Sequence, residues 1–333
     1  MICFRKLLML YSFLQFSFAV NAQEGLLDSI IHPDSLHRVV SVLAADSLQG
    51  RYTGSKENNI AAAYIADEFQ KAGLKAVAGN KGYFQEIKPG WNNVIGVLQG
   101  KSKPGELVIF SAHYDHVGTK YTNPSPRAGG LADVERNDTI FNGANDDASG
   151  VSAVICLARY FAAMNNNERT ILFIAFTGEE LGLLGSSALA NIIAPDSIVA
   201  MINIEMIGRE KYRNARPIVT GDDQSNMLKI LNRNYRELAT KKPQKEFFKI
   251  DTYNNEHLFR RSDNFPFALK GVPAHTVMLT PPDDIYYHSE NDEPNTLNYK
   301  VMSNIVQAIA VAATGILSGK DTPSRIRRNA IKN

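Results

Sequence analysis

Three short apolar runs in this chain end at residues that commonly bind metals. The runs cover residues 107–112, 171–177 and 199–204, and the side chains that follow them are His113, Asp115, Glu179, Glu180 and Glu205. Runs of this length, rich in Val, Ile and Phe, are typical of buried strands in a largely parallel sheet, and such sheets bind ligands beyond the carboxyl ends of their strands. The pattern predicts an α/β fold with a metal-centred site at one edge of its sheet.

The first 22 residues have the composition of an export signal. Basic residues precede an apolar stretch at 7–20, and small residues at Val20 and Ala22 have the spacing that signal peptidases recognise. A membrane anchor is the alternative, but the stretch is shorter than the ~20 apolar residues that span a bilayer and contains Gln15. We expect residues 1–22 to be removed and the protein to be periplasmic or extracellular, with no later segment apolar enough to cross a membrane.

Cysteine content and charge exclude several functions for the mature chain. Removal of the signal leaves Cys156 as the sole cysteine, so neither an internal disulfide nor a cysteine-based zinc site can form. Cys156 lies in a helical apolar pattern and is expected to be a small buried hydrophobe rather than a nucleophile. The mature chain balances 34 basic residues, which are the 36 of the whole chain minus Arg5 and Lys6, against 34 acidic ones. Nothing in this balance suggests a nucleic-acid partner.

The chain is expected to fold as a single domain at residues 33–319. Residues 23–32 are interpreted as a short lead-in. The basic segment 320–333 is interpreted as a solvated, mobile tail, with weak contact to an anionic surface as the alternative. The periodicity predicts helices at residues 55–71, 149–164, 179–194, 223–240 and 299–317, and strands at 93–98, 107–112, 171–177, 199–206 and 275–279. A turn at Lys103-Pro104-Gly105 should join the first two strands, and the polar loop 119–142 is a candidate rim of a cleft.

Each candidate ligand also has a purely structural explanation. His113 and Asp115 point to the same side of a strand end, as a metal-bound histidine and its supporting carboxylate would, but His113 could equally be a core histidine. His116 is a less suitable ligand because it leaves the strand toward Gly118. Asp147 or Ser149 could cap the helix that follows, although the adjacent acids Asp146 and Asp147 in a Gly-, Ala- and Asn-rich turn also suit a bridging carboxylate.

The later acidic residues and one late histidine extend this set. Glu179 and Glu180 stand at a strand-to-helix junction, where acids are ordinary, but neighbours on a helix diverge by ~100° and could have different roles. Glu205 is harder to explain without a metal, because a buried carboxylate is costly unless it is paired; Arg209 could be that partner. His288 lies in a polar loop. His113, Asp146, Glu180, Glu205 and His288 could together hold two zinc ions as two His-carboxylate halves joined by one bridging carboxylate.

Five motifs carry these residues in order along the chain. They are Ser111-Ala112-His113-Tyr114-Asp115, Asn145-Asp146-Asp147-Ala148-Ser149-Gly150, Thr177-Gly178-Glu179-Glu180, Asn203-Ile204-Glu205-Met206-Ile207-Gly208 and Tyr287-His288-Ser289. The series resembles the co-catalytic dizinc aminopeptidase family, which includes bacterial leucyl aminopeptidases and glutamate carboxypeptidase. The similarity extends from about Leu36 through Leu317 and includes Gly50-Arg51-Tyr52-Thr53-Gly54-Ser55 and Arg261-Ser262-Asp263.

The resemblance implies a zinc-exopeptidase, phosphorylase/hydrolase-like fold, with a mixed, largely parallel central sheet and helices on both faces, that binds two Zn²⁺ ions and peptide substrates. By the same resemblance, His113 and Glu205 would hold one zinc, Glu180 and His288 the other, and Asp146 would bridge them. Asp115 would orient His113, Glu179 would be the general base, Tyr287 would assist the oxyanion, and the Asp146–Asp147 peptide would be cis. Two positions depart from the family pattern. The family more often has Asp at the position of Glu205 and His at the position of Asn264.

The expected activity is hydrolysis of amino-terminal peptide bonds by a zinc-activated water. One alternative is a glutaminyl cyclase, which resembles this fold but uses one zinc; the complete ligand set for two metals argues against it. Another is a non-catalytic binding module on the same scaffold, as in receptor ectodomains that have lost ligands. The presence of every proposed ligand and of the base argues against that alternative.

Overall fold

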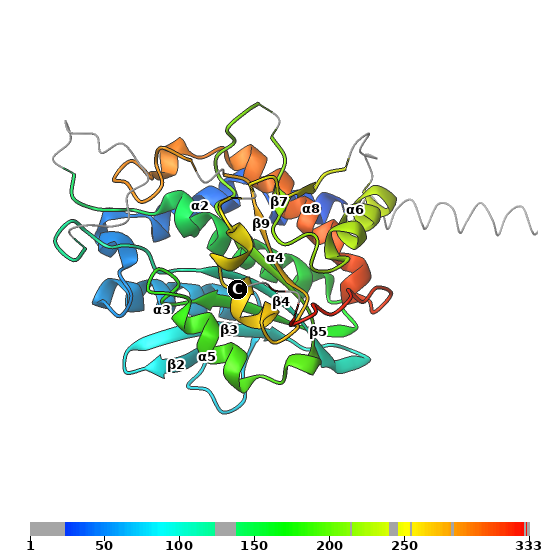
Figure 1. The fold of residues 1–333 in the computed structure, drawn as a ribbon. Coiled ribbons are helices and arrows are strands. Elements are labelled where there is room, and N and C mark those ends of the chain that lie inside the picture. Colours follow the sequence, from blue (N-terminus) through cyan, green and yellow to red (C-terminus); the bar gives the residue numbers. More distant parts are fainter. Residues whose placement is uncertain are drawn as a thin grey trace, which may run out of the picture.

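A computed structural model describes residues 24–123, 138–213, 215–239, 246–253, 255–280, 283–329 and 331. Its centre is one sheet with helices on both faces (Figure 1). The strands of the described chain are β1 (Lys75–Ala76), β2 (Phe84–Lys88), β3 (Trp91–Leu98), β4 (Lys103–His113), β5 (Arg169–Phe176), β6 (Ile198–Glu205), β7 (Ile218–Val219), β8 (Lys249–Ile250) and β9 (Ala274–Met278). The predicted mixed α/β architecture is confirmed.

The order of the strands explains why the site lies at the carboxyl ends of the central strands. It is β1-β3-β5-β4-β6-β9-β7-β8, with β2 paired to β3. The four central strands β5, β4, β6 and β9 are parallel, whereas β3 and β7 join them antiparallel on either side. The carboxyl ends of parallel neighbours meet at the same edge, so residues that follow β4, β5 and β6 are brought together.

Helices cover the two faces unequally. Besides a helix at residues 24–30, they are in the described residues α2 (Pro33–Leu43), α3 (Lys56–Lys71), α4 (Ser149–Met164), α5 (Leu184–Ile192), α6 (Met227–Leu238), α7 (Asn264–Ala268) and α8 (Tyr299–Leu317), with short 3₁₀ turns at Asp46–Arg51, Pro195–Ser197, Leu258–Arg260 and Pro294–Thr296 and a π turn at Ala144–Ala148. Buried side chains of α2, α3, α4, α6 and α8 share one hydrophobic cluster, and those of α5 and α7 another. Successive residues of β5 alternate between these clusters, as the pleat requires.

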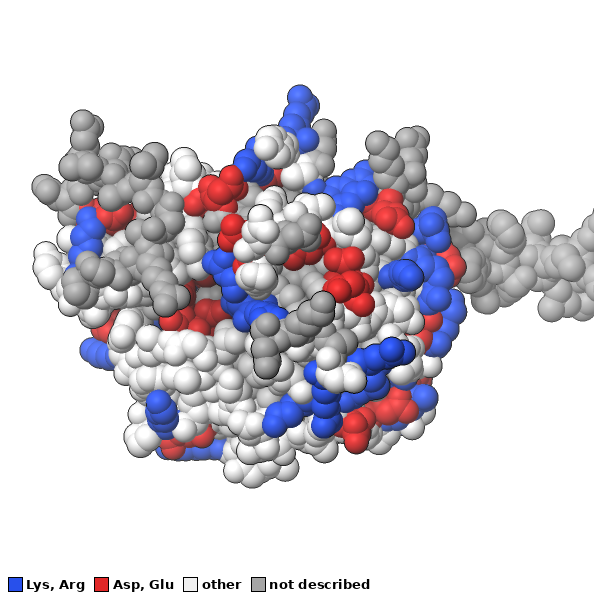
Figure 2. Space-filling model, in the orientation of Figure 1, with Lys and Arg blue, Asp and Glu red and all other residues white. Residues whose placement is uncertain are grey.

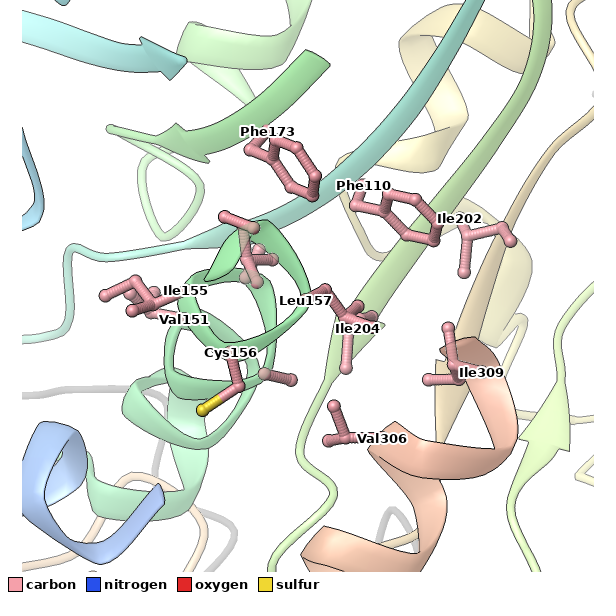
Figure 3. Packing of buried hydrophobic residues seen from close by; sticks show 14 of the residues in the cluster. Phe110, Val151, Ile155, Cys156, Leu157, Phe173, Ile202, Ile204, Val306 and Ile309 are labelled. Atoms are coloured by element: carbon pink, nitrogen blue, oxygen red, sulfur yellow. The ribbon is translucent and has the colours of Figure 1, made fainter. Parts of the chain in front are cut away.

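Phe110 lies at the centre of the larger cluster. Its ring stacks between those of Phe161 and Phe173, with centroid distances of 5.6 and 5.8 Å, and it is fully buried. Figure 3 shows it between β5 and β6, facing the helices that carry Leu157 and Ile309. This ring therefore connects the middle of the sheet to the helices below it.

Replacing Phe110 with Ala should lower the free energy of unfolding by about 3–5 kcal/mol, because the transfer energy of the ring is lost and a cavity remains. Chemical denaturation at a fixed metal concentration measures the loss. The matched control is Ile192→Ala, whose side chain is 73% exposed at the end of α5 and should change stability by no more than about 0.5 kcal/mol. Equal losses in both variants would contradict this packing.

The domain is larger at both ends than we predicted. Residues 24–30, within the expected lead-in, form a helix; Leu27 is buried, and the carbonyl oxygen of Ile31 accepts a hydrogen bond from Ser303 of α8 (2.6 Å). The prediction of a solvated tail is wrong where the tail is described: Ile326 is buried in the second cluster and its N–H donates to Gly271. Apolar contact outweighs the local basic charge there. The expected signal, residues 1–22, lies outside the described residues.

Two local predictions also need correction. The helix expected from Glu179 begins only at Leu184, because Gly178, Gly182 and Leu183 all have positive φ and form a tight turn instead. Lys103 belongs to β4 rather than to a turn, and β5 separates β3 from β4 in the sheet. Local periodicity shows neither feature, because both depend on contacts with distant segments. The predicted rim loop is described only in part, at 119–123 and 138–142.

We expect from the sequence that no segment beyond the signal is apolar enough to span a membrane. Judged by length and composition alone, that expectation is wrong. Within the described residues, Ala144–Met164 and Tyr299–Leu317 are long and apolar enough. However, 78% and 67% of their most apolar windows are buried inside the domain, as for core helices. Their apolar character is explained by packing against the sheet.

Charges of both signs are mixed over the face shown in Figure 2. Lys and Arg side chains alternate with Asp and Glu among the described residues there, and red side chains gather around the middle of the view.

Buried Cys156 fits its predicted role as a small hydrophobe, since burial raises the pKa of its thiol to about 12.

Candidate metal centre

The ends of three central strands bring the predicted ligands to one edge of the sheet. His113 is the last residue of β4, Glu205 is the last residue of β6, and Glu179 and Glu180 lie in the turn after β5. Asp146 comes from the π turn before α4, and His288 from the loop before α8. Five segments that are far apart in the sequence thus supply one site.

Asp146 stands between the two histidines. Its Oδ1 is 3.1 Å from Nε2 of His113, and its Oδ2 is 3.2 Å from Nε2 of His288. Each carboxylate oxygen therefore faces a different imidazole. This is the arrangement that a carboxylate bridging two cations needs.

A first group of donors surrounds Oδ2 of Asp146. His288 Nε2 is 3.2 Å from Oε2 of Glu180, and His116 Nδ1 is 3.0 Å from the other oxygen, Oε1. Single donor atoms of these four residues all lie within 4.8 Å of one another. His116, which the sequence indicates as a less suitable ligand, is fully buried in this group.

The second group contains His113, Glu205 and Glu179, again with one donor atom of each within 4.8 Å of the others. Glu205 is 8% exposed, and its Oε2 has no hydrogen-bond partner among the described residues. Arg209 is not its partner, since that guanidinium pairs with Asp284 and Asp292. The longer side chain at this position therefore still delivers a carboxylate to the site.

The protonation equilibria of these carboxylates show the crowding of negative charge. Burial raises the pKa of Glu179 well above its usual range, and Glu180 and Glu205 raise it further. Burial likewise raises the pKa of Glu205 to about 7. Burial also acts to raise the pKa of Glu180, but the neighbouring His288 and His116 lower it to about 2. Divalent cations would relieve this repulsion.

Asp115 forms several hydrogen bonds beside His113. Its carboxylate accepts hydrogen bonds from the Thr53 hydroxyl (2.7 Å) and from the N–H groups of Glu179 (3.2 Å) and Glu180 (3.3 Å). Nδ1 of His113 is 3.8 Å from this carboxylate and 3.2 Å from the backbone oxygen of Asp115. Asp115 therefore positions the Glu179–Glu180 turn as well as the imidazole.

The turn that carries Asp146 is held by backbone hydrogen bonds rather than by helix capping alone. The Asp146–Asp147 peptide is cis, as the resemblance implied. Asp147 Oδ1 accepts from the N–H of Gly150 (3.0 Å) and of Met206 (3.1 Å), so it ties the start of α4 to the end of β6. Asn145 accepts from the N–H of Gly208 at 2.7 Å. The same turn thus caps α4 and positions Asp146.

Asp292 supports Asp146 through hydrogen bonds to the backbone. Its carboxylate accepts from the N–H groups of Asn145 (2.9 Å) and Asp146 (3.1 Å) and forms an ion pair with Arg209 at 2.7 Å. It is fully buried. No local pattern identifies Asp292 as a site residue, because only the fold brings residue 292 to residue 146.

Replacing Asp292 with Ala should lower the free energy of unfolding by about 3–5 kcal/mol, because it leaves Arg209 buried with one of its partners removed and frees two buried N–H groups. Zinc affinity should also fall, since Asp146 loses its support. Denaturation and zinc titration measure the two effects. Asp283→Ala, which removes an exposed ion pair with Lys211, is the control and should change neither appreciably. An unaltered zinc affinity in Asp292→Ala would argue against the supporting role.

Arg51 is another residue whose role the sequence did not reveal. It is fully buried, and its guanidinium donates to backbone oxygens of Tyr114 (2.8 Å), Asn142 (2.6 Å), Gly143 (2.9 Å) and Leu43. Burial lowers its pKa to about 10 against the opposing effect of nearby carboxylates. It links the His113 strand end to the segment that leads into Asp146.

Asn264, at the position where the resemblance leads us to expect histidine, belongs to a buried polar network. Its side-chain oxygen accepts from the Thr276 hydroxyl (2.8 Å), and its amide donates to the carbonyl of Phe259 (3.0 Å). Asn203 donates to both Thr276 (3.1 Å) and Ser262 (2.7 Å). The Asn264 side chain is therefore satisfied by hydrogen bonds to β9 and to the 3₁₀ turn Leu258–Arg260.

Both donor groups open into a cavity of about 1120 Å³. Its lining includes Asp146, Glu179, Glu180, Glu205, Tyr287 and His288 from the site, apolar side chains such as Val117, Leu181, Leu258, Phe265 and Met278, and the charged Glu256, Arg260 and Arg261. The Tyr287 ring stacks on His288 at 3.9 Å, and burial together with nearby carboxylates raises the pKa of its phenol. Tyr287 therefore remains a hydrogen-bond donor beside the two groups.

The donor set fits zinc. Imidazole nitrogens and carboxylate oxygens are its usual ligands besides thiolates. Several buried donor atoms of the site have no hydrogen-bond partner in the described residues: Nδ1 and Nε2 of His288, Nε2 of His116, Oε2 of Glu205 and Oδ2 of Asp147. Unpartnered polar atoms are rare in a folded interior, and metal coordination would satisfy those that face the two groups.

Known proteins share both the fold and part of the sequence. A probable zinc metalloprotease of Phaeosphaeria nodorum is 37% identical over 121 residues, which are 36% of this chain and 24% of that protein; the chain thus matches about a quarter of that relative's length. The LapA aminopeptidase of Legionella pneumophila has a similar structure, with a TM-score of 0.66 and 20% identity over 91% of this chain and 75% of that one.

Two further structures share the fold. BSAP, a zinc aminopeptidase from Bacillus subtilis, has a TM-score of 0.66 at 16% identity and covers 88% of this chain and 97% of its own. A glutaminyl cyclase from Bacteroides thetaiotaomicron has a TM-score of 0.60 at 19% identity, with coverage of 85% and 97%. Residues 93–313 match the model of Peptidase family M28, which is more than half of the chain and includes every predicted metal ligand. This chain therefore belongs to peptidase family M28.

Proposed function

We propose that this protein is a zinc-dependent aminopeptidase that uses two zinc ions to hydrolyse amino-terminal peptide bonds. The observation that carries the proposal is the pair of adjoining donor groups that share Asp146 and open into one cavity. His113 and Glu205 would hold one ion, and Glu180 and His288 the other. Membership of peptidase family M28 supports peptide substrates.

Two bound zinc ions would lower the pKa of an attacking water and polarise the scissile carbonyl. The protein supplies the proton transfers. Glu179 faces the His113–Glu205 group from the turn after β5 and lines the cavity, so it can accept the proton of the water and deliver it to the leaving amine. Tyr287, also on the cavity wall, would donate a hydrogen bond to the developing oxyanion.

Restriction to the amino terminus is supported by the charge of the site. Carboxylates of Asp146, Glu180 and Glu205 line the inner cavity and would attract a free α-ammonium group. The names of two structures that share the fold, LapA aminopeptidase and BSAP, agree with this mode of cleavage. The cavity wall has both apolar and charged side chains, so a peptide-library digest is needed to define residue preference.

The decisive experiment combines metal analysis with three substrates. The purified protein should contain two zinc ions per chain and release the amine from aminoacyl anilides. It should leave N-acetylated analogues intact and lose activity with a chelator. Cyclisation of Gln-initiated peptides with one zinc per chain would instead establish the glutaminyl cyclase alternative. Chelator-insensitive peptide binding without turnover would indicate a non-catalytic module.

A further inference from the structure

His116 is built into the metal centre by its backbone. It lies three residues beyond the end of β4, where it forms a parallel bridge with Tyr52 and its N–H donates to the carbonyl of Arg51 (3.3 Å). A second backbone hydrogen bond holds the same segment, since the N–H of Gly118 donates to the carbonyl of Gly50 at 3.0 Å. The segment that carries His116 is therefore held in place by residues more than 60 positions earlier in the chain.

The imidazole ring of His116 is confined on two sides. A Cβ atom on Gly143 would come within 2.5 Å of Cγ and Cδ2 of the ring, so only glycine allows the ring to lie there. The His288 ring meets it edge-on, with centroids 5.4 Å apart and planes at 75°. Because His116 is fully buried, its ring cannot turn out into solvent.

The confined ring directs Nδ1 toward two carboxylates. The distance from Nδ1 is 3.0 Å to Oε1 of Glu180 and 3.8 Å to Oδ2 of Asp146. His288 Nε2 is 3.2 Å from the same Asp146 oxygen and 3.2 Å from Glu180 Oε2. Donors on a tetrahedral zinc with bonds of ~2.0–2.1 Å lie about 3.3–3.4 Å apart. The observed separations of 3.0 to 3.8 Å bracket this value.

We propose that His116 is a direct ligand, through Nδ1, of the zinc ion held by Glu180 and His288. This inference rests on the proposed two-zinc function and adds a ligand to it. The ion would have two imidazoles and two carboxylates, whereas the ion at His113 and Glu205 would have one imidazole. Glu180 and the shared Asp146 offset part of the charge of this Zn²⁺, and a neutral imidazole adds a donor without adding charge.

The alternative arrangement is a hydrogen bond from Nδ1–H to Glu180, with no bond to the metal. Both arrangements leave Nε2 without a partner in the described residues, so that atom does not distinguish them. The number of imidazoles bound to zinc does. A consequence of ligation is that the Glu180–His288 ion binds more tightly than its neighbour and is the last to leave on chelation.

The test uses X-ray absorption of the wild-type protein loaded with one and with two equivalents of zinc. With one equivalent, two imidazoles should be bound to the ion; with two, three imidazoles should be shared by the two ions. One imidazole with one equivalent, and two imidazoles shared by two ions, would overturn the ligand assignment. This measurement needs no variant and therefore does not depend on whether a substituted protein folds.

Zinc titration of His116→Ala provides a second readout. The affinity of the tighter site should fall by more than the about 10–100-fold that loss of an outer hydrogen-bond partner costs. His37→Ala, which removes an exposed histidine of α2, should bind zinc as the wild type does. An unchanged affinity in His116→Ala overturns this inference but leaves the two-zinc function intact, whereas a wild type that binds at most one zinc overturns the proposed function itself.

Discussion

Replacing Glu179 with Gln should lower the rate of peptide hydrolysis by about 10²–10⁴-fold while zinc content stays near that of the wild type. Glutamine has nearly the same shape but cannot accept a proton from the attacking water. Glu179 is well placed for this transfer because it lies in the turn after β5, next to His113 and Glu205, and lines the cavity. Steady-state kinetics on an aminoacyl anilide, together with zinc analysis, measure both quantities.

The control for this variant is Glu237→Gln, which removes an exposed carboxylate of α6 far from the cavity and should retain full activity. The geometry also permits a different role, because Glu179 can offer an oxygen to the same group as His113 and Glu205. Loss of one zinc ion in Glu179→Gln would identify the residue as a ligand rather than a base. Near-normal turnover would remove it from the mechanism altogether.

Replacing Arg51 with Met should lower the free energy of unfolding by about 3–5 kcal/mol. Methionine keeps most of the buried volume but leaves four backbone oxygens without their donor, among them those of Tyr114, Asn142 and Gly143. It also removes a buried positive charge near several carboxylates. Zinc affinity should fall as well, because Arg51 connects the segments that carry His113 and Asp146.

Chemical denaturation and zinc titration of the same variant test both effects. Arg51→Lys should recover only part of the loss, since an ammonium group cannot reproduce the planar fork that reaches several oxygens. Arg236→Met, an exposed position on α6, serves as the control and should remain within about 0.5 kcal/mol of the wild type. If Arg51→Met were as stable as this control, the guanidinium would not be the connection we describe.

The predicted strands and the residues that follow them agree closely with the structure. The predicted run 171–177 corresponds to β5, Arg169–Phe176, and the predicted helices 149–164 and 299–317 correspond to α4 and α8. These elements could be predicted because their apolar side chains repeat with the period of the secondary structure and are buried. Three of the five predicted ligands, His113, Glu180 and Glu205, lie together for a related reason, since the parallel strands that they follow end on the same side of the sheet.

The residues that were missed have no comparable local signal. Arg51 binds carbonyl oxygens from residue 43 to residue 143, and Asp292 contacts backbone 146 positions earlier in the chain. His116 was set aside because it lies beyond the end of β4, and only its pairing with residues 51–52 and the close approach of Gly143 place it in the site. The prediction of a helix over the turn at 179–183 is wrong because the presence of a glycine does not by itself reveal whether that residue will adopt a positive φ.

The amino-acid sequence by itself determined the α/β class, the strands β3, β4, β5, β6 and β9 and which side chains could bind zinc, because buried apolar periodicity and donor chemistry are properties of short segments. Only the tertiary structure decided how those donors are grouped, that Asp146 faces both histidines, and that Arg51, His116 and Asp292 join them. Each of these contacts connects residues that are distant in the chain, and their distances follow from the packing of the whole domain rather than from any local preference.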